Sequence, residues 1–477
     1  MYYIYTMKNY TLIVAVTLCA LCDNVSAQFT SQNISLLSIW DDSANVVPEP
    51  VYGIRYQGCW GWADTSNGRE YAFIGSSRPG TYVIEVTNPT IPVLRDYVPG
   101  IGNANKSIWH EYQTYEKYLY IVCDDGGPNT FQIADLSYLP DSVHLVHNDS
   151  SIFKRSHTIF INNDKMYCGS VSFVGSHASM AVFSLSNPAM PQLLRKLDDD
   201  YPAIASVHDM FVRNDTVYAS CGSQGLHIYK FNSNNTFTEL GSLANPNGYY
   251  NHSSYLNEDG TVLINCDEVP DGIPVRLVDL TDVSNPAVYS TFSSNPGATP
   301  HNPYIKDGKA VIAYYQDGIQ IYNIDNPGNP VRIGFFDTHP QNVSGYESPA
   351  YKGAWGAYAD LPSGVLLASD MQLGLFMLDT DTLLSSSKGN EKEKNSLSLY
   401  PNPSSKNIFV QYESAKEFSA VVSIVNIKGQ KVFSRNEKIK KGNNRLKIDI
   451  SSLTTGMYAL VVAEEKETFV SRKFIKE

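Results

Sequence analysis

Residues 208–219 read His208-Asp209-Met210-Phe211-Val212-Arg213-Asn214-Asp215-Thr216-Val217-Tyr218-Ala219. Apolar residues flank the Asn214-Asp215 pair on both sides, and this type of pair tolerates the positive φ that a tight hairpin turn demands. A second apolar segment, Leu226–Tyr229, follows after a glycine-containing turn. The stretch therefore predicts three consecutive short strands, the first of which begins at His208.

The same pattern recurs seven times, and each copy begins with a tryptophan or a histidine. The copies start 44 to 54 residues apart, at Trp60, His110, His157, His208, His252, His301 and Trp355. Self-similarity at this period, with strand-turn-strand content in each unit, is typical of propeller blades rather than of a helical solenoid. We therefore expect an all-β chain with a seven-bladed β-propeller over residues 28–384.

The seventh repeat has no fourth strand after Leu378-Asp379. Residues 34–41, ahead of the first repeat, have the pattern of a strand without a hairpin partner. If this segment paired with the last blade, it would close the ring and cover two sheet edges that would otherwise be exposed. We expect residues 34–41 to complete the seventh blade.

The first repeat also carries a family resemblance. Its motifs are Cys59-Trp60-Gly61-Trp62, Gly68-Arg69-Glu70-Tyr71-Ala72 and Val86-Thr87-Asn88-Pro89. Over roughly residues 31–384 the chain resembles the choice-of-anchor B family of LVIVD-repeat β-propellers. That family is defined by its architecture and its varied cell-surface anchors, so the resemblance implies a fold and no established reaction.

The N-terminus has the pattern of a signal peptide. Lys8 precedes the apolar run 11–22, and Val25-Ser26-Ala27 offers small residues for cleavage after Ala27. A retained membrane anchor would need about 20 apolar residues, and a lipoprotein at Cys22 would follow the bulky Leu21. We expect residues 1–27 to be removed and the mature protein to have no transmembrane helix.

The C-terminal part forms a second domain. Residues 385–396 are polar and charged and predict a flexible linker. Beyond them, the motifs at 397–403, 425–432 and 453–458 resemble the type A sorting domain of the type IX secretion system, and alternating apolar residues predict a small β-sandwich over 397–477. The resemblance implies the secretion machinery as a partner and an extracellular or outer cell-surface location. The alternative is an ordinary accessory sandwich that binds another molecule.

Charge and cysteine content limit the possible partners and disulfide bonds of the chain. The net charge is −12, yet residues 397–477 hold 14 Lys and Arg against 8 Asp and Glu, so the main domain is strongly acidic and nucleic acid is excluded as a partner. Five cysteines remain after the expected cleavage, Cys59, Cys123, Cys168, Cys221 and Cys266, and an odd number cannot all pair within one chain. A disulfide scaffold is not expected.

The residues that open the repeats define a candidate site. The first strand of each blade lines the central channel, so these residues should converge at one end of it. Across a two-residue turn the paired residue numbers have a constant sum, which predicts His208 opposite Cys221, His110 opposite Cys123, His157 opposite Ser170 and His252 opposite Asp267. Acidic residues stand close by in the sequence, namely Glu111, Asp124, Asp125, Asp209, Glu268, Asp317 and Asp370.

Two uses of this channel end follow. Imidazole with thiolate and carboxylate groups suits zinc, copper or iron, so a divalent metal ion is a candidate cofactor for His110, His157, His208, His252, His301 and Asp267. An unknown extracellular ligand is a candidate for Trp60, Trp109, Trp355, Asp124, Asp209, Asp317 and Asp370. The alternative is a purely structural role. The histidines would then form hydrogen bonds to neighbouring blades and the cysteines would fill the core, since a sequence repeat duplicates any residue that packs well.

The corresponding functions are a surface-displayed binding module and a metal-dependent enzyme (a hydrolase, lyase or oxidase). A cysteine nucleophile is disfavoured because nothing in the pattern lowers a thiol pKa. Elemental analysis of untagged protein separates the two functions.

Overall fold

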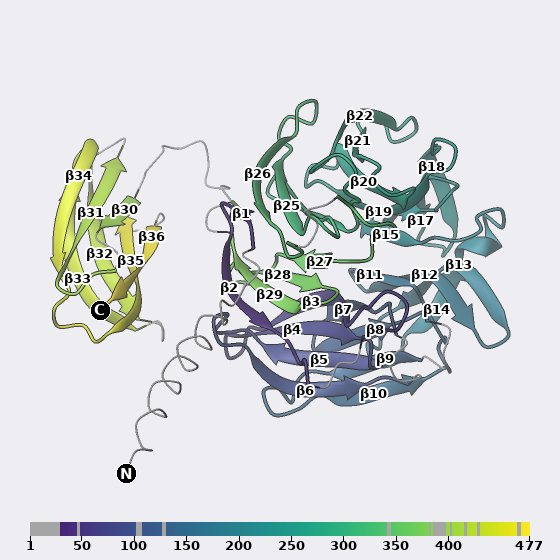
Figure 1. Ribbon diagram of the computed structural model, residues 1–477, viewed down its shortest axis with the longest axis horizontal. Coiled ribbons are helices and arrows are strands. Elements are labelled where there is room, and N and C mark those ends of the chain that lie inside the picture. The colour runs from purple at the N-terminus through teal and green to yellow at the C-terminus, as the bar shows by residue number, and fades with distance from the viewer. Residues whose placement is uncertain are drawn as a thin grey trace, which may run out of the picture. The chain divides into compact units, whose positions relative to one another are not determined.

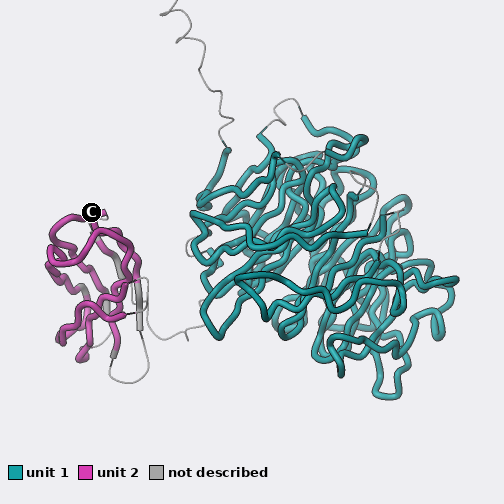
Figure 2. Tube along the Cα trace, turned by 90° about the horizontal axis from the view of Figure 1, so that it is seen from below, with its two compact units in different colours: residues 1–385 teal, residues 386–477 magenta. Residues whose placement is uncertain are grey.

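The computed structural model describes residues 29–44, 48–101, 107–125, 130–340, 345–380, 383–384, 397–400, 403–414, 417–426, 430–464 and 469–477. The chain divides into two compact units, residues 1–385 and 386–477 (Figure 2). The expected signal peptide, 1–27, and the whole of the expected linker, 385–396, lie outside the described residues.

Unit 1 contains seven antiparallel sheets, which radiate from a common centre among the described residues (Figure 1). The first three are β3 (Tyr56–Asp64), β4 (Arg69–Ser76), β5 (Gly80–Glu85), β6 (Val93–Pro99); β7 (Glu111–Tyr115), β8 (Tyr118–Val122), β9 (Phe131–Asp135), β10 (His144–Asp149); and β11 (Thr158–Asn162), β12 (Lys165–Phe173), β13 (Ser176–Ser184), β14 (Gln192–Lys196). The next two are β15 (Asp209–Arg213), β16 (Thr216–Ser220), β17 (Leu226–Phe231), β18 (Phe237–Leu243); and β19 (Tyr250–Leu256), β20 (Val262–Val269), β21 (Val275–Asp279), β22 (Ala287–Phe292).

The last two sheets each include a strand from the N-terminal segment. They are β23 (Pro303–Lys306), β24 (Lys309–Ala313), β25 (Ile319–Asn323), β26 (Val331–Phe336) with β1 (Ser31–Gln32); and β27 (Ala354–Tyr358), β28 (Leu366–Asp370), β29 (Gly374–Asp379) with β2 (Ser35–Trp40). The register of the last pair places Ser35 opposite Asp379 and Trp40 opposite Leu375. Segment 29–42 therefore contacts two sheets through strand pairing.

The same segment also reaches the first sheet. Asp41 forms an ion pair with Arg55 at 2.6 Å, and the Tyr82 hydroxyl donates to Asp42 at 2.9 Å. The Trp40 ring lies 4.8 Å from the Tyr82 ring. Three consecutive sheets in space, the sixth, the seventh and the first, are thus held together by one short piece of chain.

Turn chemistry explains the hairpins. Asn214 and Asp215 have φ of 50° and 57°, and Asp307 and Gly308 have φ of 49° and 70°. These are the positive angles that the turn residues predict, because Asn, Asp and Gly adopt the left-handed region at low cost. The expected hairpin turns are confirmed at these positions.

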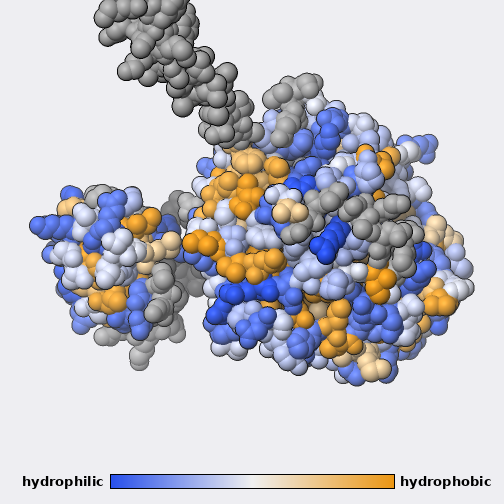
Figure 3. Space-filling model, turned by 60° about the horizontal axis from the view of Figure 1, so that its bottom comes forward, coloured by the Kyte–Doolittle hydropathy of each residue, from blue (hydrophilic) through white to orange (hydrophobic). Residues whose placement is uncertain are grey.

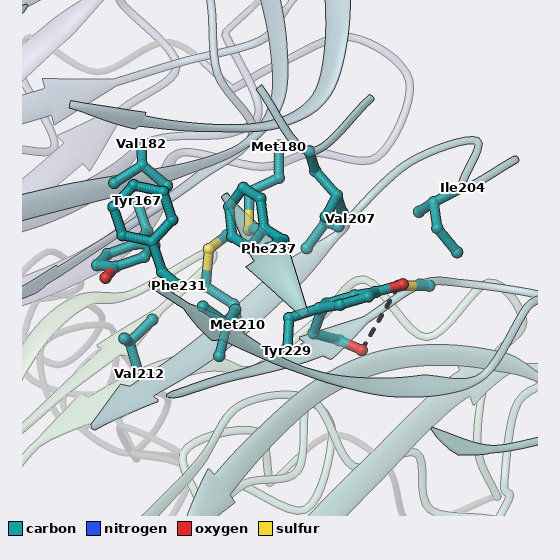
Figure 4. Packing of buried hydrophobic residues seen from close by; sticks show 14 residues of the cluster. Tyr167, Met180, Val182, Ile204, Val207, Met210, Val212, Tyr229, Phe231 and Phe237 are labelled. Carbon is teal, nitrogen blue, oxygen red and sulfur yellow. Dashed lines mark hydrogen bonds between the residues drawn. The ribbon is translucent and has the colours of Figure 1, made fainter. Parts of the chain in front are cut away.

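Successive inner strands contact one another, and β27 contacts β3. The space between neighbouring sheets is filled by apolar side chains, as in the cluster that joins Tyr167, Met180 and Val182 to Met210 and Tyr229 (Figure 4). Each sheet is therefore apolar on both faces, while the outer strands expose residues such as Leu193 and Val288. On the surface, apolar side chains form separate patches among hydrophilic ones (Figure 3).

Unit 2 consists of two sheets that share one core. They are β30 (Leu397–Tyr400), β31 (Asn407–Ser414), β34 (Gly442–Asp449); and β33 (Lys431–Ile439), β32 (Phe418–Asn426), β35 (Gly456–Glu464), β36 (Phe469–Lys476). Alternate residues such as Ile408 and Val410 from one sheet meet Val422 and Ile424 from the other. This is the packing that period-two apolar patterns produce.

The described part of unit 1 holds one short 3₁₀ helix, η1 (Leu197–Asp199). Within the described ranges, no helix has the length and apolar character needed to cross a bilayer.

Candidate functional site

A cavity of about 430 Å³ lies at the centre of unit 1. Residues from all seven inner strands line it, from Trp60 on β3 to Gly356 on β27. Strand alternation sends every second side chain of an inner strand toward this space. The size is within the range of small-molecule sites, about 300–1,000 Å³.

Four histidine rings follow one another along the cavity wall. The ring centroids are 4.1 Å apart for His157 and His208, 4.3 Å for His208 and His252, and 4.4 Å for His252 and His301. We call these four residues the histidine arc. Tryptophans extend it at both ends: Trp109 lies 6.3 Å from His157, and Trp355 lies 4.9 Å from His301.

Hydrogen bonds set the tautomers within the arc. His208 Nδ1 lies 3.1 Å from the carbonyl oxygen of His252, and His301 Nδ1 lies 2.5 Å from that of Trp355. A carbonyl only accepts, so each Nδ1 carries the proton and donates it. The neutral ring then keeps a lone pair on Nε2, which is available to a hydrogen-bond donor or a metal ion.

Burial keeps most of the arc uncharged. It lowers the pKa of His301 to about 3 and places the pKa values of His208 and His252 well below the ordinary histidine value. Burial alone would lower the pKa of His157 too, but the hydrogen bond that its Nδ1 donates to Asp124 at 2.7 Å and the charge of Asp124 outweigh this effect and raise that pKa. The pKa of His157 is therefore shifted upward, whereas the pKa values of the other three rings are shifted downward.

Replacing Asp124 with Asn should lower the His157 pKa, because the effect of burial is then opposed only by the smaller contributions of the Glu111 and Asp209 charges. The raised pKa contributes stability that is fully present below about pH 6.5 and is lost as pH rises through the folded pKa. The destabilisation by D124N should therefore be largest near pH 6 and shrink in alkaline solution. NMR titration of the imidazole protons and urea unfolding at both pH values check this. Asp141→Asn, at an exposed turn position, is the matched control; an unchanged His157 pKa in D124N would contradict the assignment.

Four acidic residues also line the cavity: Glu111, Asp209, Glu268 and Asp360. Burial raises the pKa values of Glu111 and Asp209 to about 7, and also raises that of Glu268. Glu111 accepts a hydrogen bond from Trp355 Nε1 at 3.0 Å, and Glu268 accepts one from the Tyr315 hydroxyl at 2.7 Å. Near neutral pH Glu111 and Asp209 can therefore either donate or accept a proton toward a ligand.

Gly58 leaves space for the carboxyl group of Glu111. A Cβ at this position would lie 2.4 Å from the carbonyl oxygen of His110 and 3.1 Å from Glu111 Oε2. A larger residue would push the carboxyl group out of place, so the glycine is required by close approach rather than by its φ.

Comparison with known proteins identifies a family that matches the second unit. Residues 398–477 match the family model described as the secretion system C-terminal sorting domain. The C-terminal unit is a sorting domain.

The sorting domain indicates that the protein is exported to the cell surface or the extracellular space and that it interacts with the secretion machinery. No curated protein matches the chain. Among solved structures, similar chains include the WD40 β-propeller domain of Doa1, with 10% identity, a TM-score of 0.44 and coverage of 75% of this chain and 100% of that one. Others are a putative 6-phosphogluconolactonase from Bacteroides uniformis (12% identity, TM-score 0.42, coverage 82% and 98%) and the computationally designed Ika8 protein (9%, 0.42, 68% and 82%).

In the unit ahead of the sorting domain, eight of the expected site residues line the cavity. They are Trp60, Trp109, Trp355, His157, His208, His252, His301 and Asp209. Asp124 does not line it but reaches it through the hydrogen bond to His157.

His110 is a correction. It lies between Trp109 and Glu111, which both line the cavity, but His110 itself does not line it. Its Nδ1 is 2.7 Å from Gln57 Oε1 and 3.1 Å from Ser107 Oγ. This residue is buried between sheets and serves packing and hydrogen bonding.

Asp317 and Asp370 are also displaced from the expected site. Asp317 follows β24 and accepts from Ser294, Asn295 and Tyr346 at 2.6–2.7 Å in a separate hollow. Asp370 ends β28 and accepts from the backbone N–H groups that follow it, at 2.9 and 2.8 Å. Both are turn residues of the sheets and lie outside the central cavity.

Asp267 is the fourth residue that lies outside the expected site. The constant-sum rule holds where the hairpins are regular, with Asp209 opposite Ser220 and Glu111 opposite Val122. In β19 a bulge inserts an extra residue at His252, so Asp267 pairs with Asn251. The Asp267 carboxylate instead forms a buried ion pair with Arg276 at 2.8 Å.

The thiols play a smaller part than expected. All five cysteines of the described region are free and buried, and only Cys59 lines the cavity. Burial raises the pKa of Cys59 to about 12, which keeps it protonated and poorly nucleophilic.

Three tyrosines of the site carried no sequence signal. Tyr250 and Tyr351 line the cavity, and Tyr315 holds Glu268. They lie outside the repeat openings, and tyrosine is abundant throughout the chain, with 32 copies.

Proposed function

We propose that the protein is a secreted or surface-displayed binding module whose seven sheets form a seven-bladed β-propeller with an extracellular ligand in the central cavity. In this proposal β2 closes the ring, the signal peptide ends near Ala27, residues 385–396 are a linker and the type IX system exports the chain. The resemblance to the choice-of-anchor B propellers supports the same architecture. The alternative, a metal-dependent enzyme, gains no support from the comparisons.

The observation that carries the proposal is the cavity wall itself. A run of four contacting imidazoles between two tryptophans offers apolar ring faces, while Nε2 lone pairs and carboxyl groups offer polar contacts. Apolar surfaces with a few convergent polar groups are typical of small-ligand sites. The expected ligand is a small polar molecule, such as a sugar unit or a short peptide end, that stacks on the rings.

A cavity-filling variant tests this. Gly356 lines the cavity, and a Cβ there would find its nearest atoms at 3.8 Å (Asn302 Nδ2) and 3.9 Å (Ser369 Oγ). We expect Gly356→Leu to fold normally and to weaken binding at least tenfold, because the leucine occupies ligand space.

The measurement is a thermal-shift and calorimetry screen of mono- and oligosaccharides and short peptides against the mature chain. Ala287→Leu adds the same side chain on the exposed outer strand β22 and is the matched control. A probe that binds G356L as tightly as the unaltered protein would place the binding site elsewhere.

A further inference from the structure

We propose that His252, Glu268 and His301 bind a divalent transition-metal ion such as zinc at one end of the cavity. This inference rests on the proposed function, since it names a ligand class for the same cavity. Of the six metal ligands expected from the sequence, this proposal keeps His252 and His301. Glu268 is added to them.

Geometry brings the three residues together. One ligand atom from each lies within 4.8 Å of the others, and His252 Nε2 is 3.9 Å from Glu268 Oε2. In a tetrahedral zinc site with metal–ligand distances of about 2.0 Å, ligand atoms are about 3.3 Å apart. Side-chain shifts of about 1 Å or less would therefore close the set around an ion.

The backbone is shaped for this convergence. The bulge in β19 leaves His252 without a cross-strand partner, and such bulges re-aim side chains next to functional sites. His301 precedes β23 of the neighbouring sheet, so the set joins two sheets. His252 is 5% exposed and its Nδ1 is buried without a hydrogen-bond partner in the described structure, so no such bond resists a small rotation of the ring.

Tyr315 orients the carboxylate. Its hydroxyl donates to Glu268 Oε1 at 2.7 Å and its ring stacks on His301 with centroids 4.4 Å apart. The residue has a φ of 41°, a left-handed conformation that is unfavourable for a bulky side chain. This backbone conformation is held by the hydrogen bond that the Ala354 N–H donates to the Tyr315 carbonyl oxygen at 2.8 Å. Partners that orient metal ligands in this way are typical of metal sites.

The donor set selects the ion. Two imidazoles and one carboxylate suit zinc and similar transition metals, whereas calcium and magnesium prefer all-oxygen sets. Nδ1 of His301 donates to the Trp355 carbonyl, which leaves Nε2 as the nitrogen with a lone pair. Three protein ligands leave a fourth position for a molecule in the cavity.

The test uses the mature chain, residues 28–477, purified without an affinity tag and freed of metal with a chelator. Zinc chloride is titrated by calorimetry and cobalt(II) by visible absorption. We expect one ion per chain and a tetrahedral cobalt spectrum. Glu268→Gln, which still accepts from Tyr315, should weaken zinc binding at least tenfold, and Tyr315→Phe should weaken it about tenfold.

Glu239→Gln is the matched control. It alters another His–Glu pair, since His227 Nδ1 lies 2.7 Å from Glu239 Oε1 on the outer strands, away from the cavity. Zinc affinity should be unchanged in this variant. Equal melting temperatures show that the variants fold, and if E268Q does not fold, Y315F carries the test.

The outcomes separate the two proposals. Absence of zinc binding, or E268Q and Y315F that bind zinc as tightly as the unaltered chain, overturns the metal site. If G356L nevertheless abolishes binding of a sugar or peptide probe, the cavity proposal stands without the metal. If zinc binds with the expected loss in E268Q while such probes bind G356L normally, the metal site stands and the organic ligand does not occupy the cavity.

Discussion

Removal of residues 28–42 from a chain that spans residues 28–477 is expected to lower the free energy of unfolding of unit 1 by about 5 kcal/mol or more. Ile34 is buried, the half-buried Leu37, Ile39 and Trp40 pack against two apolar clusters, and full burial of a large apolar side chain contributes about 1.5–3 kcal/mol. The deletion also breaks the ion pair of Asp41 with Arg55 and leaves β29 as an open edge, which favours aggregation.

Urea unfolding followed by far-ultraviolet circular dichroism measures this loss. A chain that ends at residue 385 is the control, because it removes the other unit and should leave the transition of unit 1 in place. Trp40→Ala should show a smaller loss of about 3 kcal/mol. A synthetic peptide of residues 28–42 should restore stability to the deleted protein. If the deleted protein unfolds at the same urea concentration as the intact one, β2 does not complete the seventh sheet.

Glu111→Gln is expected to raise the free energy of unfolding by about 3 kcal/mol at pH 8 and to change it little near pH 4. Burial raises the Glu111 pKa from 4.5 to about 7. The neutral carboxyl group's contribution is fully present below about pH 4.5 and is lost as pH rises through about 7. The amide cannot ionise, and it still accepts the hydrogen bond of Trp355 Nε1.

Unfolding curves of both proteins between pH 4 and pH 9 check the prediction. The difference should grow between pH 4.5 and 7 and then level off. Glu116→Gln, exposed at the turn of the same hairpin, should show no such difference. A gap between E111Q and the unaltered protein that does not depend on pH would show that Glu111 is not held in a desolvated position.

The fold was predictable because its information is local and repeated. Pairs such as Asn214-Asp215 have the positive φ that their chemistry favours, and they recur at a regular period. Strand starts were less predictable. Trp60 was expected to open its strand, yet β3 begins at Tyr56 and has an irregular register between Tyr56 and Cys59. The position of such a bulge depends on packing against the neighbouring sheets. The sequence of a single hairpin therefore does not predict it.

The candidate site was predictable where hairpins are regular. Histidines at the repeat openings were expected at the channel, and four of the five line it. His110 instead contacts Gln57 and Ser107 and does not line the cavity, and the bulge at His252 exchanges Asp267 for Glu268 as the acidic neighbour. Tyr315 could not have been foreseen, because its role depends on a left-handed backbone angle held by the next sheet.

A crystal structure of residues 28–477 soaked in zinc chloride, with anomalous data at the zinc edge, shows directly whether the histidine-lined cavity holds a metal ion. We expect a single strong peak inside this cavity, bonded to His252, His301 and Glu268. Zinc found only at surface histidines such as His227, or histidine rings that do not share a cavity, would contradict it.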